Sequence, residues 1–302
     1  MDINNGVIIG GATGYKPERV EIFLKSLNLA QFKGKVILLV YESDLAEYER
    51  FYPPSAFGFE LIYRISRIGL ARRVRWYRTF KPLINRLFER LYRTNRHKKA
   101  ELLKKFAYPH VSRFFEFLQC LEQLAETEFV MLTDTRDVYF QQHPFRQIRN
   151  GLYLGIENPA VRLAQDSYSA GWIRDVYGEK VLAEIGSNPI CCAGVTLGDY
   201  QSVRDYLHTM LNEFLDLPYT VMAKSNYDQG IHNRLLYANR FARAIRCLPL
   251  SSVISTVGLF NYTDLTFNEA HELLLTDGSK ATVIHQYDRH KDWEERVRRQ
   301  FL

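Results

Sequence analysis

The order of apolar runs and glycines at the N-terminus places the strongest constraint on the fold. Residues 7–9 (Val-Ile-Ile) form an apolar, β-branched run that is typical of a buried strand, and two glycines follow it directly. Residues 17–29 then carry a helical pattern that begins with a proline, a residue suited to the first turn of a helix. The apolar run at 36–41 predicts a second strand. A strand, a helix and a strand in this order predict a βαβ unit, and therefore parallel pairing within a sheet.

The rest of the chain continues this alternation of strands and helices. Helical periodicity covers residues 111–125, and short apolar runs predict strands at 129–132, 152–156, 195–197 and 283–285. No internal repeat, low-complexity linker or change of composition marks a domain boundary. We therefore expect one compact α/β domain over residues 1–302.

Composition and length fit a globular protein with its own core. The chain has 302 residues, of which 46% are hydrophobic and 25% charged, a balance that excludes an intrinsically disordered protein. Its first residues lack the basic and apolar regions of a signal peptide, and no apolar stretch approaches the ~20 residues that span a bilayer, so we expect a cytoplasmic protein. The cysteines show no metal-binding spacing, and we expect reduced, mostly buried thiols at Cys120, Cys191, Cys192 and Cys247.

Positive charge is concentrated in residues 64–105. This basic segment holds 15 lysines and arginines and two glutamates, a local charge of +13, whereas the whole chain carries +6 and the remainder therefore −7. Within the segment, apolar residues follow one face of a helix, and Arg86, Arg90 and Arg93 occupy other faces. The apolar residues of this face are Phe80, Leu83, Ile84, Leu87, Phe88 and Leu91.

A basic amphipathic helix of this kind has three interpretations. It can lie in the headgroup region of an anionic membrane, bind the phosphates of nucleic acid, or pack its apolar face on the domain as an ordinary surface helix. We expect contact with an anionic membrane surface through residues 64–105 and no nucleic-acid partner, with the packed helix as the main alternative.

The loop after the first predicted strand is suited to a nucleotide. Gly11-Ala12-Thr13-Gly14 resembles the start of the NAD(P)-binding loop of sugar-nucleotide epimerases and reductases. That fingerprint requires a third glycine where the helix packs on the strand, and Pro17 stands there instead. Lys16 could still meet a phosphate, and Glu42, at the end of the second strand, a ribose. A dinucleotide site and a plain turn of small residues both remain open.

Two carboxylates follow the predicted strand at 129–132. Asp134 and Asp137, with Arg136 between them, come at a strand end, where a sheet meets solvent. Mg²⁺ and Mn²⁺ prefer oxygen ligands and commonly bridge one or two carboxylates to a diphosphate. The pattern therefore predicts a metal site, with a capped turn that contains an internal Asp–Arg pair as the alternative.

From residue 7 to about residue 290 the chain resembles the GT-A glycosyltransferases, in which a hydrophobic strand ends in an Asp-x-Asp motif. Three further elements occur in the family's order. Residues 188–199 (NPICCAGVTLGD) are similar to the floor of the donor-sugar pocket, residues 226–237 (NYDQGIHNRLLY) to the Asp-Gln element that faces the sugar, and residues 283–290 (VIHQYDRH) to the segment whose His joins the metal. The two aspartates of the motif are three positions apart here and usually two apart in the family, which leaves open which of them binds metal and which contacts the ribose.

The resemblance implies an α/β fold of the GT-A type, a single domain with a Rossmann-like mixed central sheet flanked by helices and with the basic amphipathic helix as an insertion. Residues 1–140, including the basic segment 64–105, would form the nucleotide-binding half, and residues 141–302 the donor-sugar and acceptor half. The implied activity is metal-dependent transfer, with Mn²⁺ or Mg²⁺, from a nucleoside diphosphate sugar such as a UDP-sugar. Together with the charge of the basic helix, the resemblance implies a glycan or lipid-linked glycan acceptor in cell-surface polysaccharide synthesis and an enzyme that is peripheral at the inner face of the cell membrane, with a soluble acceptor as the alternative.

The resemblance also assigns roles to individual residues. The metal ligands would be Asp134, Asp137 and His285, and Asp228 is the candidate catalytic carboxylate, either holding sugar hydroxyls or acting as a base. A structural role for His285 and a helix-capping role for Asp228 are the alternatives. Arg113 could contact a phosphate or Asp134. The nucleotide sugar would be bound by Gly10, Gly11, Ala12, Thr13, Lys16, Glu42, Arg113, Asp134, Ala193, Gly194, Gln229, Arg289 and His290.

Two other classes of function stay open. An NAD(P)-dependent enzyme of sugar nucleotides is supported by the glycine loop, although no Tyr-x-x-x-Lys pair lies in a suitable predicted helix. A non-catalytic binder of membranes or nucleic acid would be built around residues 64–105. Within the glycosyltransferase interpretation, the late His and the Asp-Gln element resemble retaining members such as the relatives of glycogenin, whereas Asp228 acting as a base would give inversion.

Overall fold

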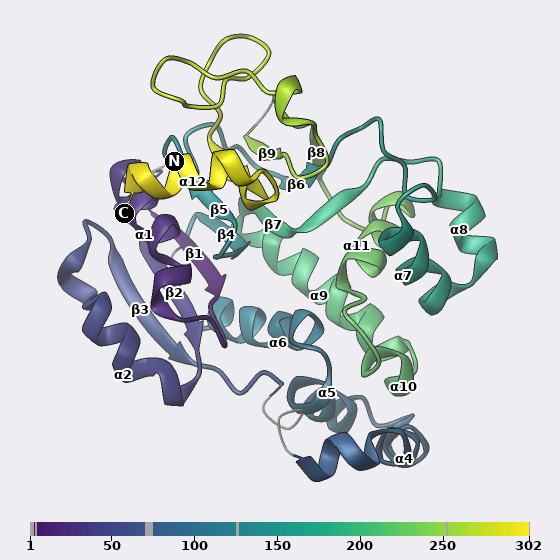
Figure 1. Cartoon of the computed structure of the whole chain (residues 1–302). Helices are drawn as coiled ribbons and strands as arrows, with labels where there is room; N and C mark the ends of the chain where they lie inside the picture. The colour runs from purple at the N-terminus through teal and green to yellow at the C-terminus, as the bar shows by residue number, and fades with distance from the viewer. Residues whose placement is uncertain (1–2, 4, 70–74, 125–126, 252, 302) are drawn as a thin grey trace.

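A computed structural model describes residues 3, 5–69, 75–124, 127–251 and 253–301. A seven-stranded sheet forms its central layer (Figure 1). In chain order its strands are β1 (Gly6–Gly11), β2 (Lys35–Val40), β3 (Glu60–Ile65), β4 (Phe129–Asp134), β6 (Leu152–Ile156), β7 (Cys191–Asp199) and β8 (Ala244–Cys247). Across the sheet they lie in the order β3-β2-β1-β4-β7-β6-β8.

The central sheet is mixed. Strand β1 pairs in parallel with β2 and β4, and β2 with β3, whereas β7 runs antiparallel between β4 and β6. Parallel neighbours require crossover connections, which here include the helices α1 (Glu21–Leu29), α2 (Glu42–Phe51) and α6 (Pro109–Glu122). The βαβ start expected from the sequence is therefore confirmed.

Each face of the central sheet has its own core. Because successive strand residues point to opposite faces, Val7 and Ile9 of β1 pack toward α6 and the later helices, and Ile8 packs toward α1 and α2. These later helices are α7 (Ser167–Tyr177), α9 (Tyr200–Asp216), α10 (Tyr219–Met222) and α11 (Asp228–Tyr237). Helix α8 (Glu179–Ile185) packs beside α7, and α12 (Lys291–Phe301) packs on α1. Strands buried on both faces explain why the predicted strands are continuous apolar runs.

A second sheet of three short strands begins where β4 ends. It consists of β5 (Val138–Phe140), β9 (Ile254–Thr256) and β10 (Val283–His285), in the order β5-β10-β9. Only residues 135–137 separate β4 from β5. This short turn joins the two sheets, and the carboxylates predicted to bind metal lie in and beside it.

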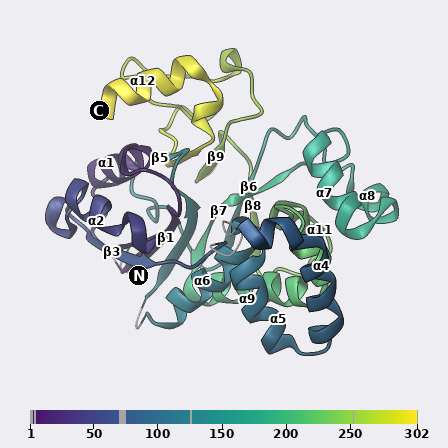
Figure 2. The ribbon, with the colours of Figure 1, turned by 60° about the horizontal axis from the view of Figure 1, so that its bottom comes forward.

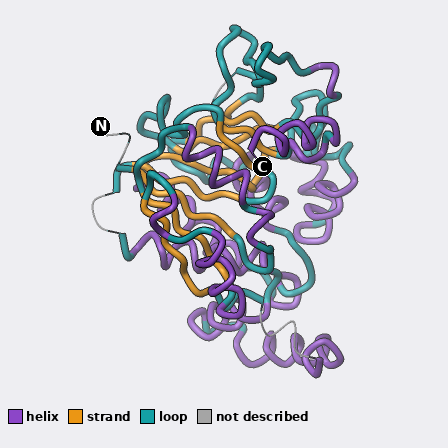
Figure 3. Tube along the Cα trace, turned by 60° about the vertical axis from the view of Figure 1, so that its left-hand side comes forward, coloured by secondary structure: helices purple, strands orange, loops and turns teal. Residues whose placement is uncertain are grey.

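The basic segment forms two helices, α4 (Arg75–Tyr92) and α5 (Arg96–Phe106). They lie at one end of the molecule, away from the central sheet, and the same end is lowest in both Figure 1 and Figure 3. Residues 70–74 of the predicted basic segment lie outside the described residues. No helix in the described part of the chain is long and apolar enough to cross a membrane.

Each predicted element corresponds to an observed one, but several ends differ. The helix predicted from residue 17 becomes α-helical only at Glu21, after a 3-10 turn at Pro17–Arg19, and the strand predicted at 195–197 is part of the longer β7. The predicted helix at 111–125 corresponds to α6, which ends at Glu122, and the predicted strand at 36–41 corresponds to β2, which ends at Val40. Four strands were not expected from the sequence, namely β3, β5, β8 and β9. All four cysteines lie in the described part of the chain and are buried there, as expected.

Candidate functional site

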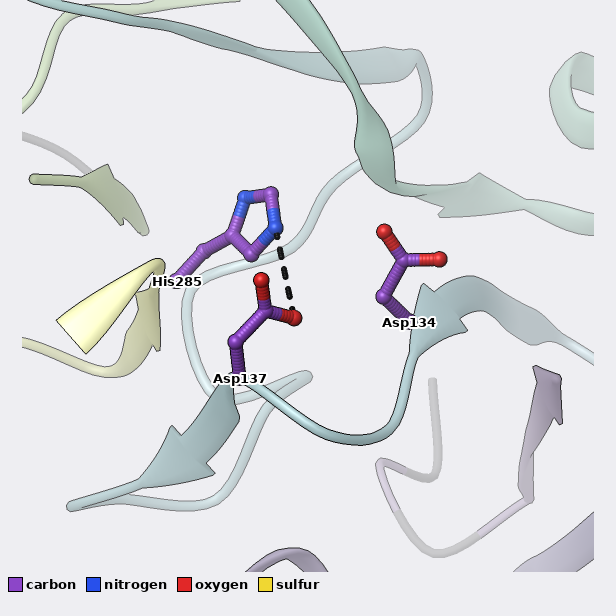
Figure 4. Close-up of side chains that lie close together, drawn as sticks. All are labelled: Asp134, Asp137 and His285. Carbon is purple, nitrogen blue, oxygen red and sulfur yellow. Dashed lines mark ion pairs between the residues drawn. The ribbon is translucent and has the colours of Figure 1, made fainter. Parts of the chain in front are cut away.

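Three side chains of metal-binding type meet where the two sheets join. Asp134 is the last residue of β4, Asp137 directly precedes β5, and His285 ends β10. Strand β10 pairs antiparallel with β5 so that His285 lies opposite Val138, which brings its ring next to Asp137 (Figure 4). One ligand atom from each of the three side chains lies within 4.8 Å of the others, and His285 Nε2 is 3.8 Å from Asp137 Oδ1.

A glycine on β7 leaves the space between these side chains open. Strand β7 pairs with β4 in a register that sets Gly194 beside Asp134. A Cβ atom at Gly194 would lie 2.7 Å from Asp134 Oδ2 and 2.8 Å from His285 Nε2, inside contact distance of both. Two carboxylates and an imidazole around a space that even a methyl group would fill are a donor set suited to a divalent cation such as Mn²⁺ or Mg²⁺.

The electrostatics of Asp137 favour a cation. Burial raises the pKa of this carboxyl group, and the neighbouring carboxylates of Asp134 and Asp288 raise it further, against the opposing effects of His285 and Arg136. Arg136 pairs with Asp137 at 3.5 Å and also with Asp288 at 3.3 Å, so its charge is shared. Since the protein itself incompletely balances the ionised form of Asp137, a bound cation would stabilise that form.

Arg113 links the predicted metal site to the predicted catalytic carboxylate. Its guanidinium group, on α6, donates to Asp134 Oδ1 and, at 3.0 Å, to Asp228 Oδ2, and all three side chains are largely buried. Burial by itself would raise the pKa of Asp134, but the charge of Arg113, together with His285, lowers it. The sequence suggested the contact with Asp134 and gave no sign of the one with Asp228. Tyr227 is the N-cap of α11, so Asp228 stands inside the helix rather than at its cap.

A cavity of about 280 Å³ surrounds these groups. Its lining residues are Tyr15, His110, Arg113, Asp134, Arg136, Asp137, Trp172, Cys192, Ala193, Gly194, Asn226, Asp228, Gln229, His285, Gln286 and Arg289. A shallower cavity of about 70 Å³ adjoins it, shares four of these residues, and is lined by Gly11, Thr13, Tyr15, Ile68, Pro109, His110, Arg113 and Asp134. A roomier cleft of about 520 Å³ beside β3 and α6 contains none of the predicted site residues.

A buried glutamate holds one of the cavity residues. Glu157 follows β6, is 4% exposed, and accepts a hydrogen bond of 3.3 Å from Gln229 Nε2. Gln229 Oε1 in turn accepts from the Cys192 thiol at 3.4 Å, and Gln286 Nε2 lies 3.6 Å from the same sulfur. Burial raises the pKa of Glu157 to about 7, with a contribution from Asp166 and against the hydrogen bonds from Gln229 and Cys192. A protonatable group therefore orients the Gln229 amide.

The glycine loop after β1 contributes only part of its length to the cavities. Gly11 and Thr13 line the shallower one, and the carbonyl oxygen of Gly11 accepts a hydrogen bond of 2.8 Å from Thr135 Oγ1. Gly10 and Ala12 are buried and serve packing, since a Cβ atom at Gly10 would lie 2.4 Å from the Thr135 methyl carbon. The loop after β1 and the turn after β4 are thus packed against each other.

Five predicted residues lie outside these two cavities, and two of them are the buried Gly10 and Ala12 just described. Lys16 and Glu42 are exposed on the surface and line neither cavity. His290 Nε2 lies 3.1 Å from the carbonyl oxygen of Val257, and its ring stacks near Trp293, so it supports the C-terminal region. The structure brings the remaining predicted residues to the two cavities.

Sequence reasoning missed several residues of the larger cavity. Tyr15, His110 and Trp172 are of types that mostly serve packing, and nothing in their local sequence marks them. Trp172 reaches the cavity because α7 packs closely on α11, where a Cβ atom at Gly230 would lie 2.9 Å from the Trp172 Cβ. Gln286 could have been predicted from the sequence, because it directly follows the candidate metal ligand His285.

Comparisons with known proteins support the fold. No family model matches the chain, and no curated protein matches it in sequence. A solved structure of the galactosyltransferase LgtC, in complex with donor and acceptor sugar analogs, matches it with a TM-score of 0.50. The match covers 97% of this chain and 95% of that chain at 14% sequence identity, so it concerns the fold alone. The chain therefore has the fold that was expected from its sequence, the GT-A fold that this galactosyltransferase also has.

Proposed function

We propose that the protein is a glycosyltransferase that moves a sugar from a nucleoside diphosphate sugar to a glycan or lipid-linked glycan. The observation that carries this proposal is the cluster of Asp134, Asp137 and His285 in one cavity with Asp228 and Gln229, on a GT-A fold. Such a cavity offers a cation site beside groups that can hold a sugar.

The cation would be held by Asp134, Asp137 and His285. When bound, Mn²⁺ or Mg²⁺ would supply positive charge that neutralises the departing diphosphate as the glycosidic bond breaks. The open space at Gly194 and the unbalanced carboxyl group of Asp137 both support this assignment.

The chain's own side chains would position the donor. Arg113 donates to the carboxylates of Asp134 and Asp228 through its two terminal nitrogens, which orients both carboxylates toward the cavity. Without a Cβ atom at Gly194, the backbone of β7 allows close approach of a sugar ring. The Asp228 carboxylate can accept hydrogen bonds from sugar hydroxyls, and Arg289, which lines the same cavity, can meet a phosphate.

The nucleoside end would extend into the shallower cavity beside Gly11 and Thr13. A UDP-sugar is the donor that we propose, and cell-surface polysaccharide the product to which the sugar is added. An acceptor carried on a lipid would require the enzyme to work at the inner face of a membrane as a peripheral protein.

A thermal-shift experiment tests the nucleotide and the metal together. UDP with Mn²⁺ should raise the melting temperature, because a ligand at 100 times its Kd stabilises the folded state by about 2.7 kcal/mol. NADP should have no such effect. The Asp137→Ala variant should lose the manganese-dependent part of the shift, whereas Asp277→Asn, at a distant exposed turn, should keep it. Stabilisation by NADP alone would contradict the proposal and support the dinucleotide alternative.

The chemical step needs a second measurement. The protein, incubated with a UDP-sugar and Mn²⁺, should release UDP as it transfers the sugar slowly to water and faster to a suitable acceptor. Asp228→Asn should reduce the rates of both transfers. Proton NMR of the new anomeric centre would assign retention or inversion. Equal UDP release by wild type and the Asp228→Asn variant would remove Asp228 from the catalytic role.

A further inference from the structure

Four large apolar side chains of α4 lie exposed in one line. Phe80, Leu83, Leu87 and Leu91 are 55%, 67%, 50% and 57% exposed, and their spacing of three and four residues aligns them along the helix. We call these four residues the α4 stripe. Scattered exposed leucines are normal on protein surfaces, but four that are contiguous on one helix indicate a binding surface.

The stripe is not the face by which α4 packs on the domain. The Tyr77 ring packs against Phe106 of α5 at 4.9 Å, and the Phe88 ring packs edge-on against Tyr219 of α10 at 5.6 Å. Asn85 is buried and accepts a hydrogen bond of 3.0 Å from the Tyr77 hydroxyl. The sequence placed Phe88 on the same face as the stripe. The structure divides that face into a packed edge and an exposed one, so α4 is anchored while its stripe remains uncovered.

Positive charge borders the stripe. At 100° per residue, Arg75, Arg86 and Arg90 fall on the flank of α4 opposite to Tyr77 and Phe88, and all three are exposed. Glu89 is the single acidic residue of α4. The whole basic segment carries +13 in a chain whose remainder carries −7, so the positive charge is specific to this end of the molecule.

We infer that the α4 stripe and its flanking arginines dock the protein on an anionic lipid bilayer. An apolar line with a basic flank is the pattern of helices that lie in the plane of a membrane interface, with the apolar side chains among the acyl chains and the cations at the headgroups. In a dimer across the stripe, the arginines of one copy of α4 would face the arginines of the other, and this repulsion between like charges disfavours the dimer.

Helices α4 and α5 are fixed to the helices α9 and α10. The Lys99 ammonium of α5 donates to the carbonyl oxygens of Leu215 and Leu217 at 2.8 and 2.5 Å, and Arg96 pairs with Asp216. This holds α5 against the end of α9, and the two helices lie side by side in Figures 1 and 2. Only residues 223–227 separate α10 from α11, which begins at Asp228.

The docked orientation suits an acceptor that is anchored in the membrane. A bilayer at α4 would lie beside α10, which residues 223–227 join to the helix that carries the candidate catalytic carboxylate, and we infer that a sugar acceptor on a lipid carrier could reach the cavity from there. This step rests on the proposed function, whereas docking itself does not.

Vesicle sedimentation tests the docking. The wild-type protein should bind phosphatidylcholine vesicles that contain about 30% phosphatidylglycerol at least tenfold more tightly than pure phosphatidylcholine vesicles. Leu83→Gln with Leu87→Gln should weaken binding about tenfold or more at low and at high salt. The matched control is Leu29→Gln, which replaces a leucine of α1 that is 68% exposed and should leave binding unchanged.

The charge contribution can be measured separately. Arg86→Gln with Arg90→Gln should weaken binding about tenfold or more at low salt and have little effect at high salt, because salt screens the attraction. Arg299→Gln, on an exposed position of α12, should have no effect. Failure of the wild type to bind anionic vesicles would overturn the inference, as would a wild-type dimer that the leucine variants convert to a monomer.

The stability of the variants and the donor site complete the test. The leucine variants should keep the wild-type melting temperature, because both leucines are at least half exposed, and loss of cooperative unfolding would show that the stripe is packed and would overturn the inference. Binding of UDP with Mn²⁺ should be unchanged in all these variants. Vesicle binding without any UDP binding would contradict the proposed function and leave the docking inference standing.

Discussion

Replacing Glu157 by glutamine should make the protein more stable than the wild type at neutral and alkaline pH. Glu157 is nearly fully buried behind the cavity, and burial raises its pKa to about 7 from the ordinary value of 4.5. A carboxyl group with a raised pKa in the folded state contributes stability that is fully present below pH 4.5 and is lost as the pH rises through 7. Glutamine has nearly the same shape, can still accept the hydrogen bond from Gln229, and does not ionise.

The size of the effect follows from the two pKa values. The gap between 4.5 and about 7 corresponds to ~3 kcal/mol at 1.36 kcal/mol per pKa unit. Between pH 4.5 and pH 8, the wild type should therefore lose up to ~3 kcal/mol of its free energy of unfolding relative to Glu157→Gln. A loss of this size is a large fraction of the 5–15 kcal/mol that is typical of proteins.

A buried histidine acts in the opposite direction and must be separated from Glu157. Burial lowers the pKa of His232 to about 3, so its contribution to stability is present above its ordinary pKa of 6.5 and is lost as the pH falls. Between pH 4.5 and 6.5 the two residues oppose each other in the wild type. His232 is present in both the wild type and Glu157→Gln, so its contribution cancels when the free energies of unfolding of the two proteins are subtracted. The difference that remains should change with pH because of Glu157 alone.

Guanidinium denaturation at pH 5, 6, 7, 8 and 9 measures the difference directly. The matched control is Glu295→Gln, which removes a carboxylate from an exposed position of α12. This variant should change the free energy of unfolding by the same amount at every pH. A difference between wild type and Glu157→Gln that stays constant from pH 5 to 9 would refute the reasoning, because Glu157 would then be ionised or solvated alike in the folded and unfolded states.

Three further predictions concern the site. Gly194→Ala should greatly raise the Mn²⁺ concentration needed for half-maximal UDP release, because its Cβ atom would occupy the space between Asp134 and His285, and a wild-type manganese titration would count against the metal site. His285→Ala should raise the same concentration, whereas His290→Ala, outside the cavities, should not, and equal behaviour of the two variants would remove His285 from the ligand set. Asp228→Asn should lower the chemical rate about a hundredfold in single-turnover experiments, and a change of less than about threefold would return it to a structural role.

The elements that the sequence predicted are those with a strong local pattern. The central strands β1, β2 and β4 are buried on both faces and appear in the sequence as apolar runs. The strands that were missed have weaker patterns for identifiable reasons. β3 and β8 lie at the two edges of the central sheet and carry polar or exposed residues, and β5 and β9 have only three residues each, too few to show a period.

The residues of the candidate site also divide into those that a local sequence pattern revealed and those that only the tertiary structure brought in. Asp134 was found because an apolar strand ends in it, and the metal-ligand role proposed for it rests on chemistry that is visible in a short stretch of sequence. The partners of that residue come from far away along the chain. Arg113 bridges it to Asp228, 115 residues away from Arg113 in sequence, and Glu157 reaches Gln229 across 72 residues. Pairings of this length depend on how β7, β10 and α11 are arranged around β4.

The sequence by itself determined the local structure wherever the pattern is strong: the buried strands of the central sheet, the point where carboxylates follow a strand, and an amphipathic basic helix with its apolar face from Phe80 to Leu91. Only the tertiary structure decided which of these features meet. Whether α4 buries or exposes its leucines depends on α5 and α10, which take Tyr77 and Phe88 and leave the α4 stripe uncovered. The physical reason is that periodicity and capping act over a few residues, whereas burial, ion pairs and pKa values are set by neighbours that packing brings together across the whole chain.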